Sequence, residues 1–178
     1  SDLEAVSAEL EATEWLCLAG PAPGLAGGFL PAELVRRARA ARVRVLLSAT
    51  GPGLKEALGA GPELVRLSRA EAARTFGPET TPEALFLELR RAGGRTLVLS
   101  DGERPVHVFH DRRRLVLHPP AIALANASTA GESLAAGLLV AMEEGWDLEP
   151  ALAFAVGAAS ADAARLFPCA ADRAGAEG

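Results

Sequence analysis

The sequence is poor in the residue types that build metal centres and disulfide scaffolds. Among its 178 residues it has no tyrosine, two cysteines, three histidines and one methionine. Two cysteines, Cys17 and Cys169, are too few for a disulfide framework and lack metal-ligand spacing. Cys17 lies in an apolar segment beside Trp15, which predicts an inert core thiol. The composition therefore excludes disulfide-rich and zinc-finger classes.

Long apolar runs and excess positive charge are also missing. No segment approaches the roughly 18 to 20 consecutive apolar residues of a membrane helix, and the acidic start is not typical of a signal peptide. The formal net charge of −5 argues against a nucleic-acid partner. Of the 18 basic residues only Lys55 is a lysine, which we interpret as coding preference. We expect a cytoplasmic protein that binds neither membrane nor nucleic acid.

What the sequence does have is an alternation of short apolar runs and amphipathic runs, separated by glycine and proline. Hydrophobic residues make up 49% and charged residues 23%, as in an ordinary globular domain. The expected strands lie at 14–19, 43–47, 63–67 and 95–99, and the expected helices at 31–41, 52–58, 69–76 and 82–92. Strands that alternate with helices predict an α/β fold with a largely parallel sheet.

The pattern changes after residue 102. Two short apolar segments, 106–109 and 114–118, flank the turn Asp111–Arg113 and predict a β-hairpin. Residues 121–127 are apolar and extended, and long Ala/Leu-rich helices are expected at 131–144 and 148–166. We expect one domain over residues 1–167 and a frayed tail over residues 168–178.

One segment has the features of a phosphate site. Small polar residues, Asn126 to Ser133, lead directly into an apolar helix. Ala130, Gly131 and Glu132 would present free N–H groups at the helix N-terminus, which attract phosphate. A carboxylate in that turn can take a proton from an attacking hydroxyl. On the local pattern alone, an ordinary capped helix with an acid in its first turn is the better interpretation.

The order of several motifs strengthens the phosphate interpretation. The chain contains, in order, LAGPAPG (18–24), LSATG (47–51), ELVRLSRAE (63–71), VLSDG (98–102) and TAGESLAAG (129–137). This order resembles the C-terminal part of the PfkB (ribokinase-like) sugar kinases, most closely the 1-phosphofructokinase and tagatose-6-phosphate kinase branch. There the motifs read L-S-G-S-L-P-P-G, V-x-L-D-T-S-G, D-L-V-K-P-N-R-E-E, V-V-S-L-G and T-V-G-A-G-D-S-x-x-A-G. The resemblance implies a three-layer, Rossmann-like α/β/α fold and ATP-dependent phosphoryl transfer to a hydroxyl of a sugar or sugar phosphate.

The resemblance also implies a role for individual residues. Glu132 stands where the family has its general base. The anion hole that binds phosphate would consist of Thr129, Ala130 and Gly131. The nucleotide-binding residues would be Ser100, Asp101, Gly102, Asn126 and Ala158. Glu71 and, indirectly, Ser68 would organise Mg²⁺. The implied partners are ATP, Mg²⁺ and a sugar phosphate.

Several of these positions depart from the family pattern. Glu132 replaces an aspartate and is one methylene longer, and Thr129 replaces the first glycine of the anion hole. Ser68 replaces the asparagine that organises Mg²⁺, while Glu71 is retained. Ser48 replaces the aspartate of D-T-S-G. Together these changes remove several polar groups that handle metal, phosphate and substrate.

The first part of the family fold, which builds the lid and the sugar-binding strands, has no counterpart in the sequence. We therefore expect an incomplete sugar pocket unless another chain or a missing N-terminal part supplies the rest. The partner expected besides the ligands is a second copy of the chain or that N-terminal part. A catalytically degenerate nucleotide-binding or subunit module is the alternative function. A third alternative is an α/β domain without any ligand.

Each candidate residue also has an ordinary structural interpretation. Ser68 and Glu71 match a helix capping box, which is favoured over a metal role. Ser100–Gly102 matches a plain strand-end turn. The small residues 155–159 match close helix packing, and the three histidines lack the acid or cysteine that a metal set would need.

Overall fold

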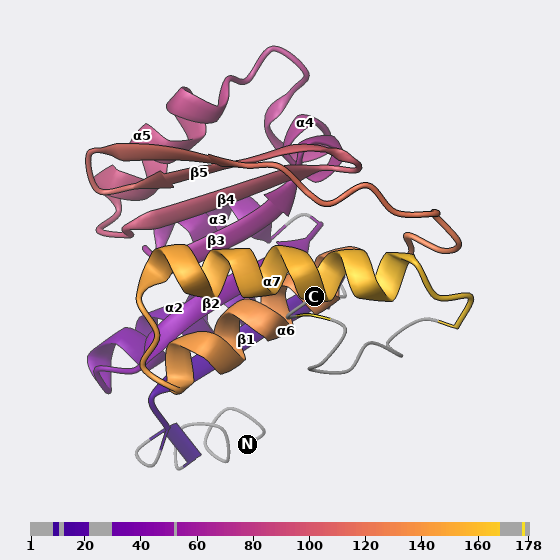
Figure 1. The fold of residues 1–178 in the computed structure, drawn as a ribbon. Helices are drawn as coiled ribbons and strands as arrows, with labels where there is room; N and C mark the ends of the chain where they lie inside the picture. The colour runs from indigo at the N-terminus through magenta and orange to yellow at the C-terminus, as the bar shows by residue number, and fades with distance from the viewer. Residues whose placement is uncertain (1–8, 11–12, 22–29, 52, 168–175, 177–178) are drawn as a thin grey trace. The chain divides into compact units, whose positions relative to one another are not determined.

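The structure is a computed structural model that describes residues 9–10, 13–21, 30–51, 53–167 and 176 (Figure 1). These residues belong to two compact units. Unit 1 comprises Ser1–Leu99 and Val108–Arg114, and unit 2 comprises Ser100–His107 and Leu115–Gly178. The predicted tail, apart from Ala176, lies outside the described residues.

Six strands form one sheet in the order of the chain. They are β1 (Trp15–Pro21), β2 (Arg44–Thr50), β3 (Leu64–Ser68), β4 (Thr96–Asp101), β5 (Arg104–His110) and β6 (Arg113–Leu117). The pairs β1–β2 and β2–β3 are parallel. Two-residue links join β4 to β5 and β5 to β6, which makes these pairs antiparallel. The sheet is therefore mixed, and the predicted α/β fold with a hairpin in the second half is confirmed.

Helices follow the strands where the sequence pattern predicts them. Unit 1 contains α2 (Leu30–Ala40), α3 (Leu54–Gly59), α4 (Arg69–Phe76) and α5 (Pro82–Arg91), and unit 2 contains α6 (Ala130–Glu143) and α7 (Leu148–Ala163). Local signals fix their starts: α5 begins where the Thr81 hydroxyl accepts the N–H of Ala84, with Pro82 at its first position. Residues 121–127 form no regular element. Within the described part of the chain, no helix is long and apolar enough to cross a membrane.

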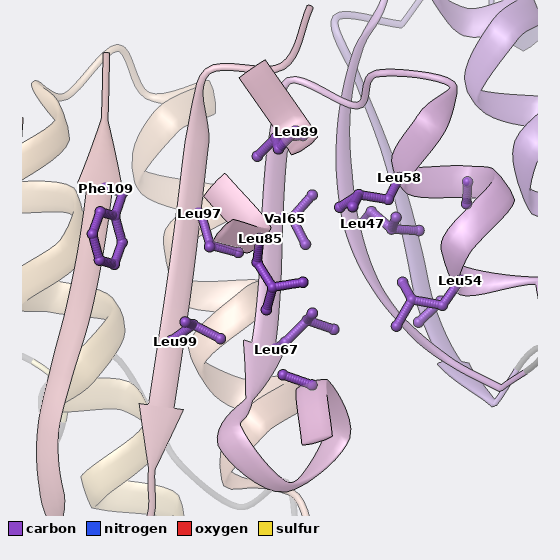
Figure 2. Packing of buried hydrophobic residues seen from close by; sticks show 13 residues of the cluster. Leu47, Leu54, Leu58, Val65, Leu67, Leu85, Leu89, Leu97, Leu99 and Phe109 are labelled. Atoms are coloured by element: carbon purple, nitrogen blue, oxygen red, sulfur yellow. The ribbon is translucent and has the colours of Figure 1, made fainter. Parts of the chain in front are cut away.

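The main hydrophobic cluster of unit 1 explains why its strands and helices form together. Alternate strand residues point to one face of the sheet, and leucines of α3 and α5 meet them there (Figure 2). The labelled side chains are Leu47, Leu54, Leu58, Val65, Leu67, Leu85, Leu89, Leu97, Leu99 and Phe109. Burial of each such side chain is worth about 1.5–3 kcal/mol. The cluster thereby holds β2, β3 and β4 at fixed positions, and with them the residues at their carboxyl ends.

The prediction that Cys17 is a core thiol is wrong. Its side chain is exposed, whereas Trp15, two residues earlier in β1, is only 4% exposed. The guanidinium of Arg44 on β2 lies over the Trp15 ring, 4.5 Å from its centroid. Since β1 is an edge strand with one neighbour, an apolar sequence there does not guarantee that every side chain is covered.

Charge pairs fix the turn between β5 and β6. Asp111 has a φ of 51°, a conformation that aspartate tolerates better than most residues. Its carboxylate lies 2.7 Å from Nη2 of Arg95 and 3.0 Å from Nη1 of Arg90. The hydrogen bond from Arg95 holds the pKa of Asp111 below its ordinary value. The turn is thus tied to the start of β4 and the end of α5.

In unit 2, helices α6 and α7 lie side by side at very short range (Figure 1). A Cβ atom at Gly137 of α6 would lie 3.1 Å from Cβ of Ala158 and 3.2 Å from Cα of Ala155. Contacts this short require small residues on both helices. The structure therefore shows the small residues of α7 in close helix packing, one of the two interpretations that the sequence permits.

We predict that Gly137→Val destabilises the protein by about 1–3 kcal/mol, because overpacking would force α6 and α7 apart. The matched control is Ala136→Val on the exposed face of the same helix, for which we expect a loss of about 0.5 kcal/mol from helix propensity alone. Urea unfolding followed by circular dichroism measures both. Equal losses in the two variants would contradict the close contact.

Candidate functional site

The N-terminus of α6 is open. Thr129 occupies the N-cap position with φ −115° and ψ 6°, and its side chain makes no capping hydrogen bond. The N–H of Ala130 reaches only the carbonyl of Ala127, at 3.4 Å. Among the described residues, the N–H groups of Gly131 and Glu132 have no hydrogen-bond partner. Two donors at the positive end of the helix dipole are thus available to an anion.

A buried carboxylate explains why Thr129 does not cap its own helix. The Thr129 hydroxyl donates a hydrogen bond to Oδ2 of Asp162 on α7, at 2.7 Å. Asp162 has no exposed surface. A buried carboxylate requires hydrogen bonds, so it keeps the Thr129 hydroxyl and holds it away from the helix end.

Asp162 is a site residue that the sequence analysis missed. Its signal was present, because Asp162 is the only charged residue in the last three turns of an otherwise apolar helix. Glu149, the other acid of α7, lies in its first turn, where acids are common. A lone acid deep in an apolar helix indicates a buried polar contact, although the sequence does not say with which residue.

Glu132 lies beside the open N–H groups in the first turn of α6. Its side chain is exposed, and in the described part of the chain its carboxylate has no hydrogen-bond or ion-pair partner. An uncommitted carboxylate next to two free N–H donors has the arrangement that a proton acceptor beside a phosphate would need. Glu132 and Gly131 lie at the same helix end, and their catalytic and anion-binding roles stay predictions.

Asn126 shapes the loop that leads into α6. Its Oδ1 accepts the N–H of Ser128 at 3.0 Å, and its Nδ2 donates to the carbonyl of Leu166 at 3.3 Å. Its own N–H donates to the carbonyl of Ala163 at 3.0 Å. Asn126 thereby ties the start of α6 to the end of α7, while contact with a nucleotide stays a prediction.

The other predicted nucleotide contacts have structural roles in unit 2. Ser100 and Asp101 are the last residues of β4, and Gly102 begins the turn to β5 with a φ of 59°. Arg104 pairs with Asp101 across this turn at 3.3 Å. Ala158 is 9% exposed and packs on Gly137, so it offers a ligand little surface. The binding of a nucleotide by these four residues stays a prediction.

The two residues proposed to organise Mg²⁺ lie in unit 1 and form a capping box on α4. The N–H of Glu71 donates to the Ser68 hydroxyl at 3.2 Å, and the N–H of Ser68 donates to Oε2 of Glu71 at 2.6 Å. Nη1 of the buried Arg66 lies 3.5 Å from the same Oε2 atom. One oxygen of Glu71 is therefore committed to protein partners.

No group of three or more histidine, cysteine, aspartate or glutamate residues is positioned to hold a metal, as far as the described residues show. Of the three histidines, His110 is engaged by the Thr96 hydroxyl, with 2.8 Å between its Nδ1 and the Oγ1 atom.

A family model described as "pfkB family carbohydrate kinase" matches residues 1–166 of the chain. The chain belongs to this family. It is 33% identical to the 1-phosphofructokinase of Rhodobacter capsulatus, in an alignment that covers 89% of this chain and 54% of that protein. The chain thus spans about half the length of this relative.

Solved structures of a phosphofructokinase and a ribokinase share the fold. Phosphofructokinase-2 from Escherichia coli, in complex with potassium, superimposes with a TM-score of 0.84 at 18% identity over 98% of this chain and 59% of that one. Ribokinase from Arabidopsis thaliana, complexed with ribose and ATP, gives a TM-score of 0.79 at 20% identity over 98% and 58%. The ribokinase-like α/β fold of this pfkB chain is therefore as the motifs implied.

We predict that Thr129→Val destabilises the protein by about 1.5–3 kcal/mol, because it removes a hydrogen bond to a buried carboxylate. Thr129→Ser keeps the hydroxyl and is expected to lose less than about 1 kcal/mol. Urea unfolding of both variants, and of each combined with Asp162→Asn, gives the coupling energy between the two side chains. Equal stability of the Val and Ser variants would show that the bond contributes nothing.

Proposed function

We propose that this chain forms the phosphate-handling portion of a sugar kinase that transfers the γ-phosphoryl group of ATP to a hydroxyl of a sugar or sugar phosphate. The observation that carries the proposal is the open end of α6, where the N–H groups of Gly131 and Glu132 and the Glu132 carboxylate have no partner among the described residues. Membership of a carbohydrate kinase family and the likeness to a 1-phosphofructokinase support the same reaction.

The proposed mechanism relies on positioning and on electrostatics. The N–H groups of Gly131 and Glu132, together with the dipole of α6, would stabilise the negative charge of the phosphoryl group during transfer. The Glu132 carboxylate would accept the proton of the attacking hydroxyl. Proteins catalyse phosphoryl transfer mainly by aligning the reacting groups and by neutralising the charge of the transition state.

Mg²⁺ would be bound together with the nucleotide, and the residue of unit 1 that would contact it is Glu71. Of the two carboxylate oxygens of Glu71, Oε2 is held by Ser68 and Arg66, so Oε1 is the one that would serve the ion. One carboxylate, completed by phosphate oxygens and water, fits the usual coordination of Mg²⁺. When bound, the ion would neutralise part of the negative charge of the phosphates.

The second candidate function is a degenerate member that binds nucleotide without turnover. The commitment of Glu71 to a capping box favours it, as does the longer side chain at position 132. A general base displaced by one methylene can lose much of its effect, because near-attack geometry depends steeply on distance.

The first test measures ATP binding by calorimetry with and without Mg²⁺, followed by ATP turnover with fructose 1-phosphate and related sugar phosphates. We expect Mg²⁺-dependent binding, and turnover that falls about 10²- to 10⁴-fold in Glu132→Gln with little change in ATP affinity. Glu143→Gln, at the exposed far end of α6, is the matched control and should keep full activity. Absence of any ATP affinity would refute both the kinase and the degenerate member.

A second test separates an active enzyme from a degenerate one. Ser68→Asn restores the family residue and also keeps the helix cap, because asparagine and serine cap helices about equally well. Combined with Glu132→Asp it should leave the free energy of unfolding within about 0.5 kcal/mol. Turnover that appears only in the double variant would identify a degenerate kinase. Turnover in the natural chain that the double variant does not exceed would identify Glu132 as a competent base.

A further inference from the structure

Three helices that the structure describes have a serine or threonine at the N-cap, and only two of them are capped by it. In α4 and α5 the N-cap residues Ser68 and Thr81 have extended backbones, with ψ of 158° and 152°. Each hydroxyl accepts the N–H of the third helical residue, as N-cap side chains commonly do. Thr129 of α6 instead has a ψ of 6°, and its hydroxyl accepts no N–H of its own helix.

The N–H that Thr129 leaves free is that of Glu132. Glu132 is the third residue of α6, so it corresponds to Glu71 of α4 and Ala84 of α5, whose N–H groups are capped. Among the described residues the Glu132 N–H has no hydrogen-bond partner. A threonine with an extended backbone at position 129 would take this N–H and close the helix end to an anion.

The carboxylate of Asp162 holds Thr129 in its non-capping conformation. Its Oδ2 atom lies 2.7 Å from the Thr129 hydroxyl. A hydroxyl has one proton and two lone pairs, so it can donate to a carboxylate and accept an N–H at the same time. Geometry separates the two bonds here, because the hydroxyl reaches α7 from a backbone with a ψ of 6°, whereas capping requires an extended one.

The energies of the two bonds decide which one forms. Asp162 is fully buried, and the loss of a hydrogen bond to a buried charge costs more than a helix cap contributes. Thr129 therefore stays with Asp162, and the helix end stays open.

We propose that Asp162 is a positioning residue of the candidate phosphate site, which keeps the Glu132 N–H free for the phosphoryl group by preventing Thr129 from capping α6. The role rests on the proposed function, because the phosphoryl group is its ligand. Asp162 has no exposed surface and acts only through Thr129. By charge alone a carboxylate near an anion site weakens binding, so the effect of its charge and the effect of its hydrogen bond have opposite signs.

The test compares Asp162→Ala with Asp162→Asn. Alanine removes the charge and the acceptor, so Thr129 can cap α6, whereas asparagine removes the charge and keeps an oxygen that accepts the Thr129 hydroxyl. The dissociation constant of Mg²⁺-ATP, measured by calorimetry, should rise about tenfold in Asp162→Ala, because one N–H donor to a charged group is lost. It should stay within about threefold of the natural value in Asp162→Asn. In turnover with fructose 1-phosphate, Asp162→Ala should lower kcat and leave the KM of the sugar phosphate unchanged.

A second substitution distinguishes positioning from a general loss of structure. Asp162→Ala/Thr129→Gly has no hydroxyl that could cap α6, so it should recover most of the affinity that Asp162→Ala loses. A purely structural contribution of Asp162 would not be recovered by removing its partner as well. Circular dichroism verifies that the variants are folded, and Asp162→Leu, which has no acceptor and fills the space, replaces an alanine variant that does not fold.

Hydrogen exchange provides a measurement that needs no ligand. The Glu132 amide, followed by NMR, should exchange more slowly in Asp162→Ala than in the natural chain, because it gains the Thr129 hydroxyl as an acceptor. If the natural chain binds no ATP, the proposed function fails, and the exchange rates still decide whether Asp162 keeps this N–H free. The proposal is overturned if the amide exchanges equally fast in both proteins, if Asp162→Ala binds ATP as tightly as the natural chain, or if Asp162→Ala/Thr129→Gly recovers nothing.

Discussion

The candidate site depends on one hydrogen bond between two helices. The carboxylate of Asp162 has no exposed surface, so it must be hydrogen-bonded inside the protein, and the Thr129 hydroxyl donates one such bond at 2.7 Å. That bond determines which groups remain available at the start of α6. If the hydroxyl instead capped its own helix, it would occupy one of the N–H groups that an anion could use. The start of α6 can therefore stay open although position 129 is a threonine and not the glycine of the family motif.

The reach of that hydrogen bond in turn depends on the spacing of the helices. Gly137 lets Ala155 and Ala158 approach α6 closely, and the short side chain of Asp162 contacts Thr129 across the same pair of helices. Asn126 adds a second connection between the two helix ends through the carbonyls of Ala163 and Leu166. The small residues along α6 and α7 thus set the spacing at which the two helix ends, and the polar residues on them, meet.

Much of this arrangement could be predicted from the sequence, because it depends on local patterns. Period-two and amphipathic runs located the strands and helices, and the Ser-x-x-Glu spacing located the capping box of α4. The pairing of Thr129 with Asp162 could not be predicted, since it depends on the register of two helices and not on either alone. The exposure of Cys17 could not be predicted, because an apolar run does not reveal which strand forms the edge of the sheet.

Each departure from the family motifs is explained by the residues that surround it in the structure. Threonine in place of the first glycine of the anion hole would be expected to obstruct it, but Asp162 holds its hydroxyl elsewhere. Serine in place of asparagine still caps α4, and the glutamate that could serve a metal is partly neutralised by Arg66. Both replacements therefore preserve the starts of the helices on which these motifs lie. The start of α6 keeps two N–H groups that have no partner among the described residues, and α4 keeps its cap.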